Sequence, residues 1–213
     1  MDKPPKLMQI VQRCEALFED LHFNAVKEWK AAVPGRKAIG YMPVYVPREL
    51  IHAAGMLPVG ILGGGDALEV IQGDAYYQSY ICRIPRSTID LGITGRLDFV
   101  DGFLVPSICD VIRNLSGIWK ILFPKVYVRY FDVPQNFDPE VGGTFYRHEL
   151  QELREGLARL ASSQTRIGAA MTPSAQVSSS AQPRIVATAS TSRCVASSPS
   201  FSRLAARIGT KAC

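Results

Sequence analysis

Short apolar runs that alternate with helical patterns are the feature of this 213-residue sequence that most limits its fold. The runs that read as strands are residues 37–42 (KAIGYM), 56–62 (MLPVGIL), 98–105 (DFVDGFLV) and 126–131 (VYVRYF). A strand, a helix and a second strand within about 30 residues form a βαβ unit, in which the two strands are parallel and the crossover is expected to be right-handed. The sequence therefore predicts an α/β fold, a flavodoxin-like or Rossmann-like three-layer sandwich around a parallel sheet.

The N-terminal element, residues 1–34, reads as helical. Apolar residues recur at i, i+3, i+4 and i+7 from Leu7 to Leu21, which predicts one amphipathic helix over residues 4–32 with a stripe that faces the core. Cys14 falls on that stripe, so we expect it to be a core residue.

The rest of the chain divides at two boundaries. Residues 35–142 hold the α/β domain, and the amphipathic segment 143–160 is expected to form a helix that bridges to an incomplete second domain. Residues 161–213 contain 12 Ser, 11 Ala, one aromatic residue and no Asp or Glu. Such a segment has little apolar surface to offset chain entropy, so it is predicted to be a disordered tail.

The abrupt loss of acidic residues has two explanations. One is a natural linker, and the other is translation out of frame near residue 161. Reading the coding DNA downstream of codon 160 in the other two frames tests the second, because a continuing α/β pattern should appear there.

The formal net charge of +5 comes from the tail alone. All 19 acidic residues lie in residues 1–160, which leaves that part with a charge of −1, whereas residues 161–213 carry six basic residues. A nucleic-acid-binding protein shows its basic patch on the folded part. We therefore expect no nucleic-acid partner.

Cysteine usage points to a reducing compartment. The five cysteines are odd in number and irregularly spaced, and no signal peptide opens the chain, so a cytoplasmic protein without a disulfide framework is expected. The longest nearly apolar run, residues 53–65, falls short of the ~20 residues that span a bilayer. No membrane segment is expected.

Two cysteines, Cys82 and Cys109, share a local setting. Cys109 follows a predicted strand and precedes a helical pattern over residues 110–122, and Cys82 is expected in a nearly similar position. The carboxyl ends of parallel strands meet at one edge, and the positive end of a helix favours thiolate over thiol. Two thiolates at one crevice suggest a soft metal centre. From the spacing alone, two buried and inert cysteines are the simpler interpretation, because free Cys is among the most buried residue types.

Two arginines flank Pro85 beside Cys82. Arg83 and Arg86 could compensate the charge of an anionic cluster or bind a phosphate-bearing substrate. They could equally belong to a solvated first helical turn. The sequence leaves both interpretations open.

Several motifs in one order carry a family resemblance. They are residues 40–58 (GYMPVYVPRELIHAAGMLP), 80–86 (YICRIPR), 106–110 (PSICD) and 130–134 (YFDVP). Together they resemble the 2-hydroxyacyl-CoA dehydratase and benzoyl-CoA reductase family, from about residue 4 to residue 160. The resemblance does not extend into the tail.

The resemblance implies a [4Fe-4S] cluster held by three cysteines of one polypeptide. Cys82 and Cys109 match two of those positions, and the third is expected in a later α/β domain that this chain lacks. Some family members have a further cysteine near the position of Pro43. Cys194 and Cys213 lie in the tail and match no family position, so the isolated polypeptide is expected to hold a cluster poorly.

The resemblance further implies reduction of benzoyl-CoA to a cyclic dienoyl-CoA. The family's reductases take electrons from ferredoxin, while partner subunits hydrolyse ATP, so the expected partners are those subunits, ferredoxin and an acyl-CoA substrate. Two alternatives remain open: a 2-hydroxyacyl-CoA dehydratase subunit, which recycles its electron, and a non-catalytic α/β interaction module.

Overall fold

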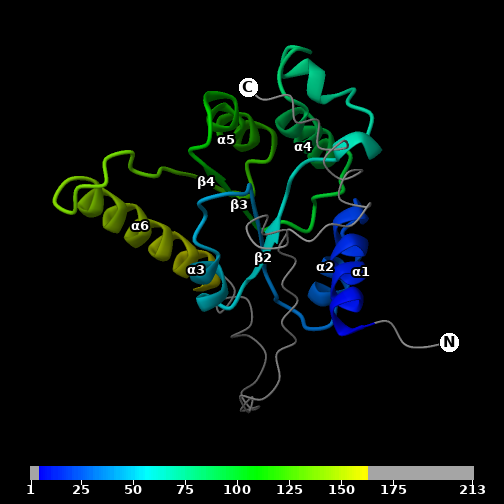
Figure 1. The fold of residues 1–213 in the computed structure, drawn as a ribbon, viewed down its shortest axis with the longest axis horizontal. Coiled ribbons are helices and arrows are strands. Elements are labelled where there is room, and N and C mark those ends of the chain that lie inside the picture. The colour runs from blue at the N-terminus through cyan, green and yellow to red at the C-terminus, as the bar shows by residue number, and fades with distance from the viewer. Residues whose placement is uncertain (1–4, 163–213) are drawn as a thin grey trace.

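The computed structural model describes residues 5–162, which fold around a parallel sheet. The strands lie in the order β2-β1-β3-β4. Their bounds are β1 Ala38–Tyr41, β2 Leu57–Gly60, β3 Gly102–Pro106 and β4 Tyr127–Phe131. Because every pair is parallel, all carboxyl ends meet at one edge of the sheet (Figure 1). The predicted α/β class with a parallel sheet is confirmed.

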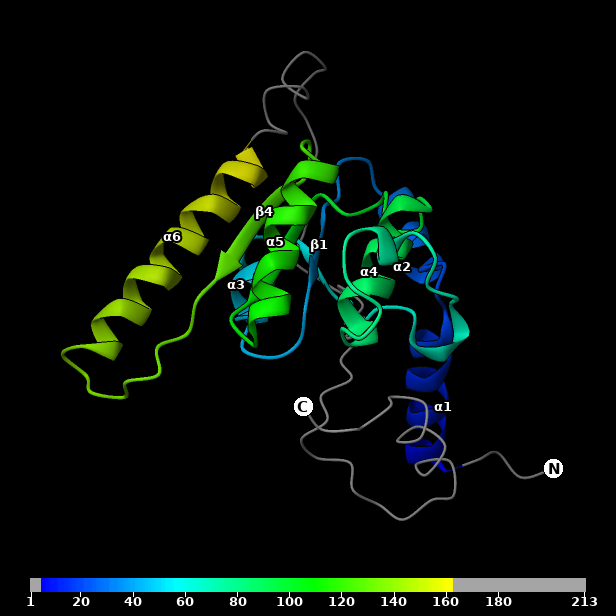
Figure 2. The same cartoon turned by 90° about the horizontal axis from the view of Figure 1, so that it is seen from above.

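Helices cover both faces of the sheet. They are α1 Lys6–Glu19, α2 Asn24–Ala31, α3 Arg48–Ala53, α4 Arg83–Ile93, α5 Asp110–Leu122 and α6 Gly142–Ser162. Figure 2 shows α3 and α6 on one side of the strands, with α2 and α4 on the other. The side chains of α5 pack in the same core cluster as those of α4. The result is the predicted three-layer sandwich.

Strand β3 shows why the core has two halves. All of its residues are buried, as expected for a strand covered on both faces. Phe103 and Val105 pack with α4 and α5, whereas Leu104 packs with α3 and α6. Side chains that alternate along the strand therefore supply both cores in turn.

The predicted single N-terminal helix over residues 4–32 is wrong, because the structure divides it into α1 and α2. Asp20 causes the break: its carboxylate accepts hydrogen bonds from the backbone N–H groups of His22 at 3.0 Å and Asn24 at 2.7 Å. Phe23 adopts a left-handed conformation with φ of 53°. A short acidic side chain that binds nearby backbone groups competes with helix hydrogen bonds, and here it starts a second helix.

The predicted core-facing stripe of α1 is also wrong. No residue of α1 is buried, and Leu7 exposes 63% of its surface. Cys14 is exposed as well, so it is not a core residue. The stripe has the correct helical period, but α1 stands at the margin of the molecule (Figures 1 and 2). Helical periodicity identifies an apolar face without specifying what covers it.

Helix α6 covers the sheet itself. Leu153 and Leu157 are fully buried beside Phe131 of β4. The predicted bridging helix 143–160 thus completes the second helical layer, and its role as a bridge to a second domain stays a prediction. The predicted tail begins in the last turn of α6, and its residues 163–213 lie outside the described part.

None of the described helices combines the length and the apolar character that crossing a bilayer requires.

Candidate metal centre

Cys109 lies where the sequence places it, between a strand and a helix. It is the N-cap residue of α5, three residues beyond the end of β3, and it is exposed. Its carbonyl accepts the first hydrogen bond of the helix, from Arg113 N–H at 2.9 Å. The thiol therefore sits at the positive end of a helix of 13 residues, where negative charge is favoured.

Cys82 is the N-cap residue of α4, but no strand directly precedes it. The expected strand–thiol–helix order fails here, because β2 ends at Gly60 and residues 61–82 form a long connection with two short 3-10 helices, η1 Gly65–Ala67 and η2 Gly73–Ala75. We call residues 61–82 the connecting segment. Cys82, at its end, is exposed like Cys109. The interpretation of two buried cysteines is therefore wrong for both.

Buried polar side chains of α4 hold the connecting segment in place. The Asp90 side chain, in a residue only 3% exposed, accepts hydrogen bonds from Gln72 N–H at 3.0 Å and Gly73 N–H at 2.8 Å. The Ser87 hydroxyl accepts one from Gly64 N–H at 3.0 Å. Because unsatisfied backbone groups are costly in a protein interior, these contacts replace the missing strand as the support for Cys82.

Arg83 and Arg86 contact the same segment. Arg83 donates from Nε to the Gly65 carbonyl at 2.8 Å and from a terminal guanidinium nitrogen to the Leu68 carbonyl. Arg86 forms an ion pair with Asp74. Both arginines thus fasten the connecting segment to α4. Their predicted role in charge compensation or substrate binding stays a prediction.

Tyr77 links the connecting segment to the first turn of α5 and is a residue that sequence reasoning missed. Its side chain is buried in the core, and its hydroxyl donates to the Val111 carbonyl in the first turn of α5 at 2.9 Å. Burial raises the pKa of Tyr77 to about 12, and the negative charges of Cys109 and Cys82 add to this effect. Both cysteines, when negatively charged, therefore raise the pKa of the same phenol. The sequence signal was weak, since Tyr77 is one of three tyrosines in DAYYQSY.

A second group of polar residues surrounds the N-terminus of α5. The Arg113 guanidinium lies 5.8 Å from the centre of the Tyr130 ring. Burial raises the pKa of Tyr130, and the charge of Asp132 adds to it, while a hydrogen bond with Ser107 acts in the opposite direction. Arg113 is one helical turn after Cys109. A cysteine followed by arginine at i+4 could have indicated this cation near the thiol.

The donor set fits two positions of a thiolate-bound metal cluster. Both thiols are exposed, both begin helices on one side of the sheet, and thiolate sulfur is the ligand of iron–sulfur clusters. Within residues 5–162, the group of three possible ligand side chains that lie together is not a cysteine trio but His148, Glu149 and Glu152. Arg129 binds Glu149 at 3.0 Å and Glu152 at 2.9 Å, so a guanidinium already neutralises those carboxylates.

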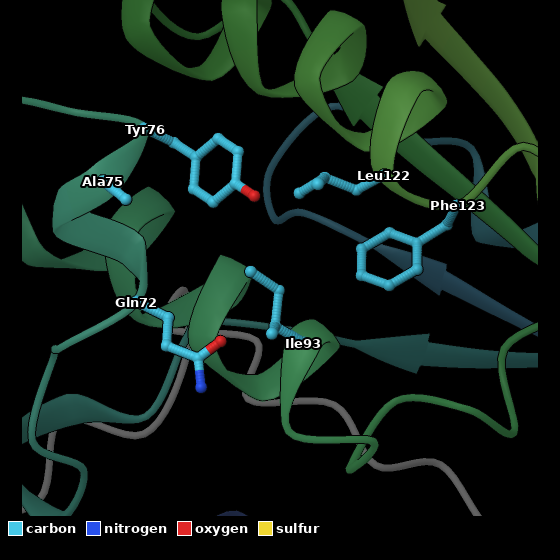
Figure 3. A pocket seen from close by; sticks show the side chains of 6 residues that line it. All are labelled: Gln72, Ala75, Tyr76, Ile93, Leu122 and Phe123. Carbon is cyan, nitrogen blue, oxygen red and sulfur yellow. The ribbon is translucent and has the colours of Figure 1, made fainter.

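A cavity of about 450 Å³ lies on the same side of the sheet, away from the thiols. Figure 3 shows the side chains that line it: Gln72, Ala75, Tyr76, Ile93, Leu122 and Phe123. Ile93 and Leu122 end α4 and α5, whereas Cys82 and Cys109 precede the first residues of these helices. Ile93 and Leu122 therefore place one side of the cavity at the C-terminal ends of α4 and α5, opposite to the thiols at their N-terminal ends.

The fold and the thiol pair define a class first: an α/β domain with flavodoxin-type strand order that carries two cysteines at the N-termini of neighbouring helices. The sequence model of the family described as "2-hydroxyglutaryl-CoA dehydratase, D-component" matches residues 43–170. The chain belongs to this family, which confirms the resemblance inferred from the motifs. The match begins just after β1 and includes β2, β3, β4 and both cysteines.

Curated relatives agree with this family. The chain is 72% identical over 151 residues to the C subunit of benzoyl-CoA reductase from Thauera aromatica, covering 71% of this chain and 39% of that protein. It is 36% identical over 111 residues to the beta subunit of (R)-2-hydroxyglutaryl-CoA dehydratase from Acidaminococcus fermentans, covering 50% and 29%. It is 32% identical over 126 residues to the (R)-phenyllactyl-CoA dehydratase beta subunit of Clostridium sporogenes, covering 59% and 33%. The chain thus spans well under half the length of these relatives.

Proposed function

We propose that this chain is the iron–sulfur subunit of an ATP-dependent benzoyl-CoA reductase, equivalent to the C subunit of that enzyme. The 72% identity to the Thauera aromatica protein supports the proposal most strongly, because it is at least twice the identity to the two dehydratase subunits. The reaction adds two electrons and two protons to benzoyl-CoA and yields a cyclohexadiene-carbonyl-CoA. Ferredoxin supplies the electrons, and ATP hydrolysis on partner subunits raises their energy.

Cys82 and Cys109 hold a [4Fe-4S] cluster in this proposal. When bound, such a cluster supplies electrons at very low potential, down to about −700 mV in the most reducing examples. The chain contributes thiolates at two helix N-termini, whose positive ends stabilise the negative sulfurs. The other ligands come from outside residues 5–162, since Cys14 lies on the exposed helix α1.

The surroundings of the thiols support a site that is covered when the enzyme assembles. Val44 and Tyr45 follow β1 and are 63% and 57% exposed, and Ile108, beside Cys109, is 43% exposed. These apolar side chains lie at the carboxyl edge of the sheet, where ligands of open α/β folds bind. An acyl-CoA or a partner protein placed there would exclude water from the electron-transfer site.

The cluster assignment is tested with single cysteine variants. The chain is reconstituted anaerobically with iron, sulfide and 2-mercaptoethanol, which can occupy the remaining cluster positions, and protein-bound iron and sulfide are then measured. Cys82→Ala and Cys109→Ala should each lose most of the bound iron, whereas the control Cys14→Ala should retain it. Unchanged iron content in both site variants would remove the cluster from the proposal.

The reaction class needs a separate assay, because the curated relatives also include 2-hydroxyacyl-CoA dehydratase subunits. The chain is co-expressed with the other subunits and given reduced ferredoxin and ATP. A reductase consumes two electrons for each benzoyl-CoA, whereas a dehydratase removes water from a 2-hydroxyacyl-CoA with no net electron consumption. Dehydration without ferredoxin oxidation would support the alternative, and no activity of either kind would support a non-catalytic module.

A cytoplasmic location belongs to the same proposal. Cysteine thiolates and an oxygen-sensitive cluster require a reducing compartment. The partners proposed for the assembled enzyme are a second cluster-bearing subunit, the ATP-hydrolysing subunits and ferredoxin.

A further inference from the structure

We infer that Tyr77 is a positioning residue for the thiol pair: its hydroxyl ties the connecting segment, which ends at Cys82, to the first turn of α5, which begins after Cys109. The inference rests on the proposed function only for its meaning in catalysis. The geometric part, that Tyr77 sets the spacing between Cys82 and Cys109, stands on the structure alone.

The hydrogen bond of Tyr77 crosses directly between the two thiol-bearing elements. Its hydroxyl donates to the Val111 carbonyl at 2.9 Å over a separation of 34 residues. Val111 is two residues beyond Cys109, and Tyr77 is five residues before Cys82. A shift of either element by an ångström would stretch this bond beyond hydrogen-bonding distance.

Burial makes that hydrogen bond an effective restraint. Tyr77 is 8% exposed and belongs to the core cluster that α4 and α5 share. Its own N–H donates to the Gly73 carbonyl at 3.2 Å, and the N–H of Gly73 donates to the buried Asp90 at 2.8 Å. The tyrosine is therefore fixed at its backbone by α4 and at its hydroxyl by α5.

Burial is the main cause that raises the pKa of Tyr77, and the negative charges of Cys109 and Cys82 add to it. A phenol that stays neutral remains a hydrogen-bond donor when the sulfurs are negative. This suits a residue that holds two thiolates apart at a fixed distance.

Cys82 needs such a restraint more than Cys109 does. Cys109 follows β3 by three residues, so the sheet fixes it, whereas Cys82 follows a long connection after β2. Outer residues that orient metal ligands commonly change metal affinity by about 10- to 100-fold when they are removed. Tyr77 would act on Cys82 in this way without touching the metal.

The first experiment measures the thiol spacing without any metal. Cys14, Cys194 and Cys213 are replaced by Ser, and nitroxide labels are attached to Cys82 and Cys109 of the full chain. The dipolar broadening between the labels is then compared for the parent protein, Tyr77→Phe and the control Tyr76→Phe. Tyr77→Phe keeps the ring and removes the hydroxyl, and circular dichroism checks that it folds.

The parent and Tyr76→Phe should show the same narrow spread of dipolar couplings, and Tyr77→Phe should show a clearly broader one. An unchanged spread in Tyr77→Phe would overturn the inference. Tyr76 is a suitable control because it is the neighbouring tyrosine, lines the cavity of Figure 3 and undergoes the same chemical change.

The second experiment separates this inference from the proposed function. After anaerobic reconstitution, iron retention against a chelator should be about 10-fold weaker in Tyr77→Phe than in Tyr76→Phe. If the parent chain binds no iron, the proposed function fails while the label spacing still decides the role of Tyr77. If iron retention is equal in both variants, the cluster stands and the positioning role is wrong.

Discussion

Single side chains decide where Cys82 lies, and most of them act on backbone groups. Asp90 and Ser87 accept hydrogen bonds from the connecting segment, and Arg83 donates to two of its carbonyls. Gly73 fits this arrangement because a Cβ there would lie 2.1 Å from the Arg86 carbonyl oxygen. The segment is thus shaped by a few polar contacts, since it contributes little regular structure of its own.

Asp90→Asn should destabilise the chain and loosen the connecting segment. The carboxylate accepts from Gln72 and Gly73 N–H groups in a buried setting, and hydrogen bonds to charged groups are each worth about 1.5–3 kcal/mol. We therefore expect the free energy of unfolding in urea to fall by roughly 1–3 kcal/mol. The control Asp66→Asn changes an exposed acid of the same segment and should stay within about 0.5 kcal/mol. Equal stability of the two variants would contradict the assigned role.

Alkaline titration should identify Tyr77 by its late ionisation. Its pKa is raised to about 12, first by burial and then by the charges of Cys109 and Cys82. A tyrosine in an unfolded chain ionises at about pH 10. The contribution of neutral Tyr77 to stability is therefore complete below about pH 10 and is lost as the pH rises through 12.

Phenolate absorbance of the wild type and Tyr77→Phe measures this effect. The variant should lack the last step of the folded-state titration, and its stability should depend less on pH between about 10 and 12. A step near pH 12 that persists in Tyr77→Phe would assign the late ionisation to another tyrosine.

At the scale of elements, helices differ in how much tertiary packing they receive. Helix α5 buries Ile112, Leu115, Ser116 and Trp119, whereas α1 buries no residue. Isolated helices shorter than about 12–15 residues are marginal in water and depend on tertiary packing. Helix α1 has 14 residues and buries none of them, so packing adds little to its stability. Helix α6, in contrast, packs closely on the sheet, because Gly156 leaves room for the side chain of Tyr127 in β4.

Two helical glycines should respond in opposite ways to alanine. A Cβ at Gly156 would lie 2.1 Å from the Tyr127 hydroxyl, so Gly156→Ala should push α6 from the sheet and cost about 1–3 kcal/mol. At Gly117 of α5 a Cβ would meet nothing within 4 Å, so Gly117→Ala should stabilise by up to about 1 kcal/mol through helix propensity. Thermal unfolding of both variants measures the two effects. A stabilising Gly156→Ala would show that α6 does not pack against Tyr127.

The whole molecule brings two thiols to one side of the sheet through its topology. Strand order β2-β1-β3-β4 places β1 next to β3, and the crossovers through α4 and α5 cover the same face. Among the described residues, Cys82 and Cys109 are the two thiols that we propose as cluster ligands, fewer than the three expected from the family resemblance. The proposed cluster must therefore be completed from beyond residues 5–162.

Cluster binding by the purified chain should depend on an added thiol. With 2-mercaptoethanol present, reconstituted iron should stay bound, because small thiolates can occupy the free cluster positions. After the small thiol is removed, a chelator should strip the iron at least about 10-fold faster. Iron loss followed by absorbance measures this, with Cys14→Ala as the control. Iron that stays bound without added thiol would show that a further ligand comes from the chain itself.

Local periodicity predicted much of the fold. The strand cores, the bounds of α5 and the position of Cys109 follow from apolar runs, helical spacing and a favourable Asp110 in the first turn. The same reasoning failed for α1, since the period of an apolar face does not say whether a partner covers it. It also failed for the break at Asp20, where a side chain outcompeted the helix.

The sequence by itself determined which elements form and which two cysteines share a position at a helix N-terminus, because those properties depend on neighbours within a few residues. The tertiary structure alone decided that Arg83 and Arg86 bind the connecting segment and that Tyr77 reaches Val111. Such contacts join residues up to 34 positions apart, and they arise only when crossovers bring separate elements together. No local pattern encodes that meeting, because it depends on how the whole chain winds around the sheet.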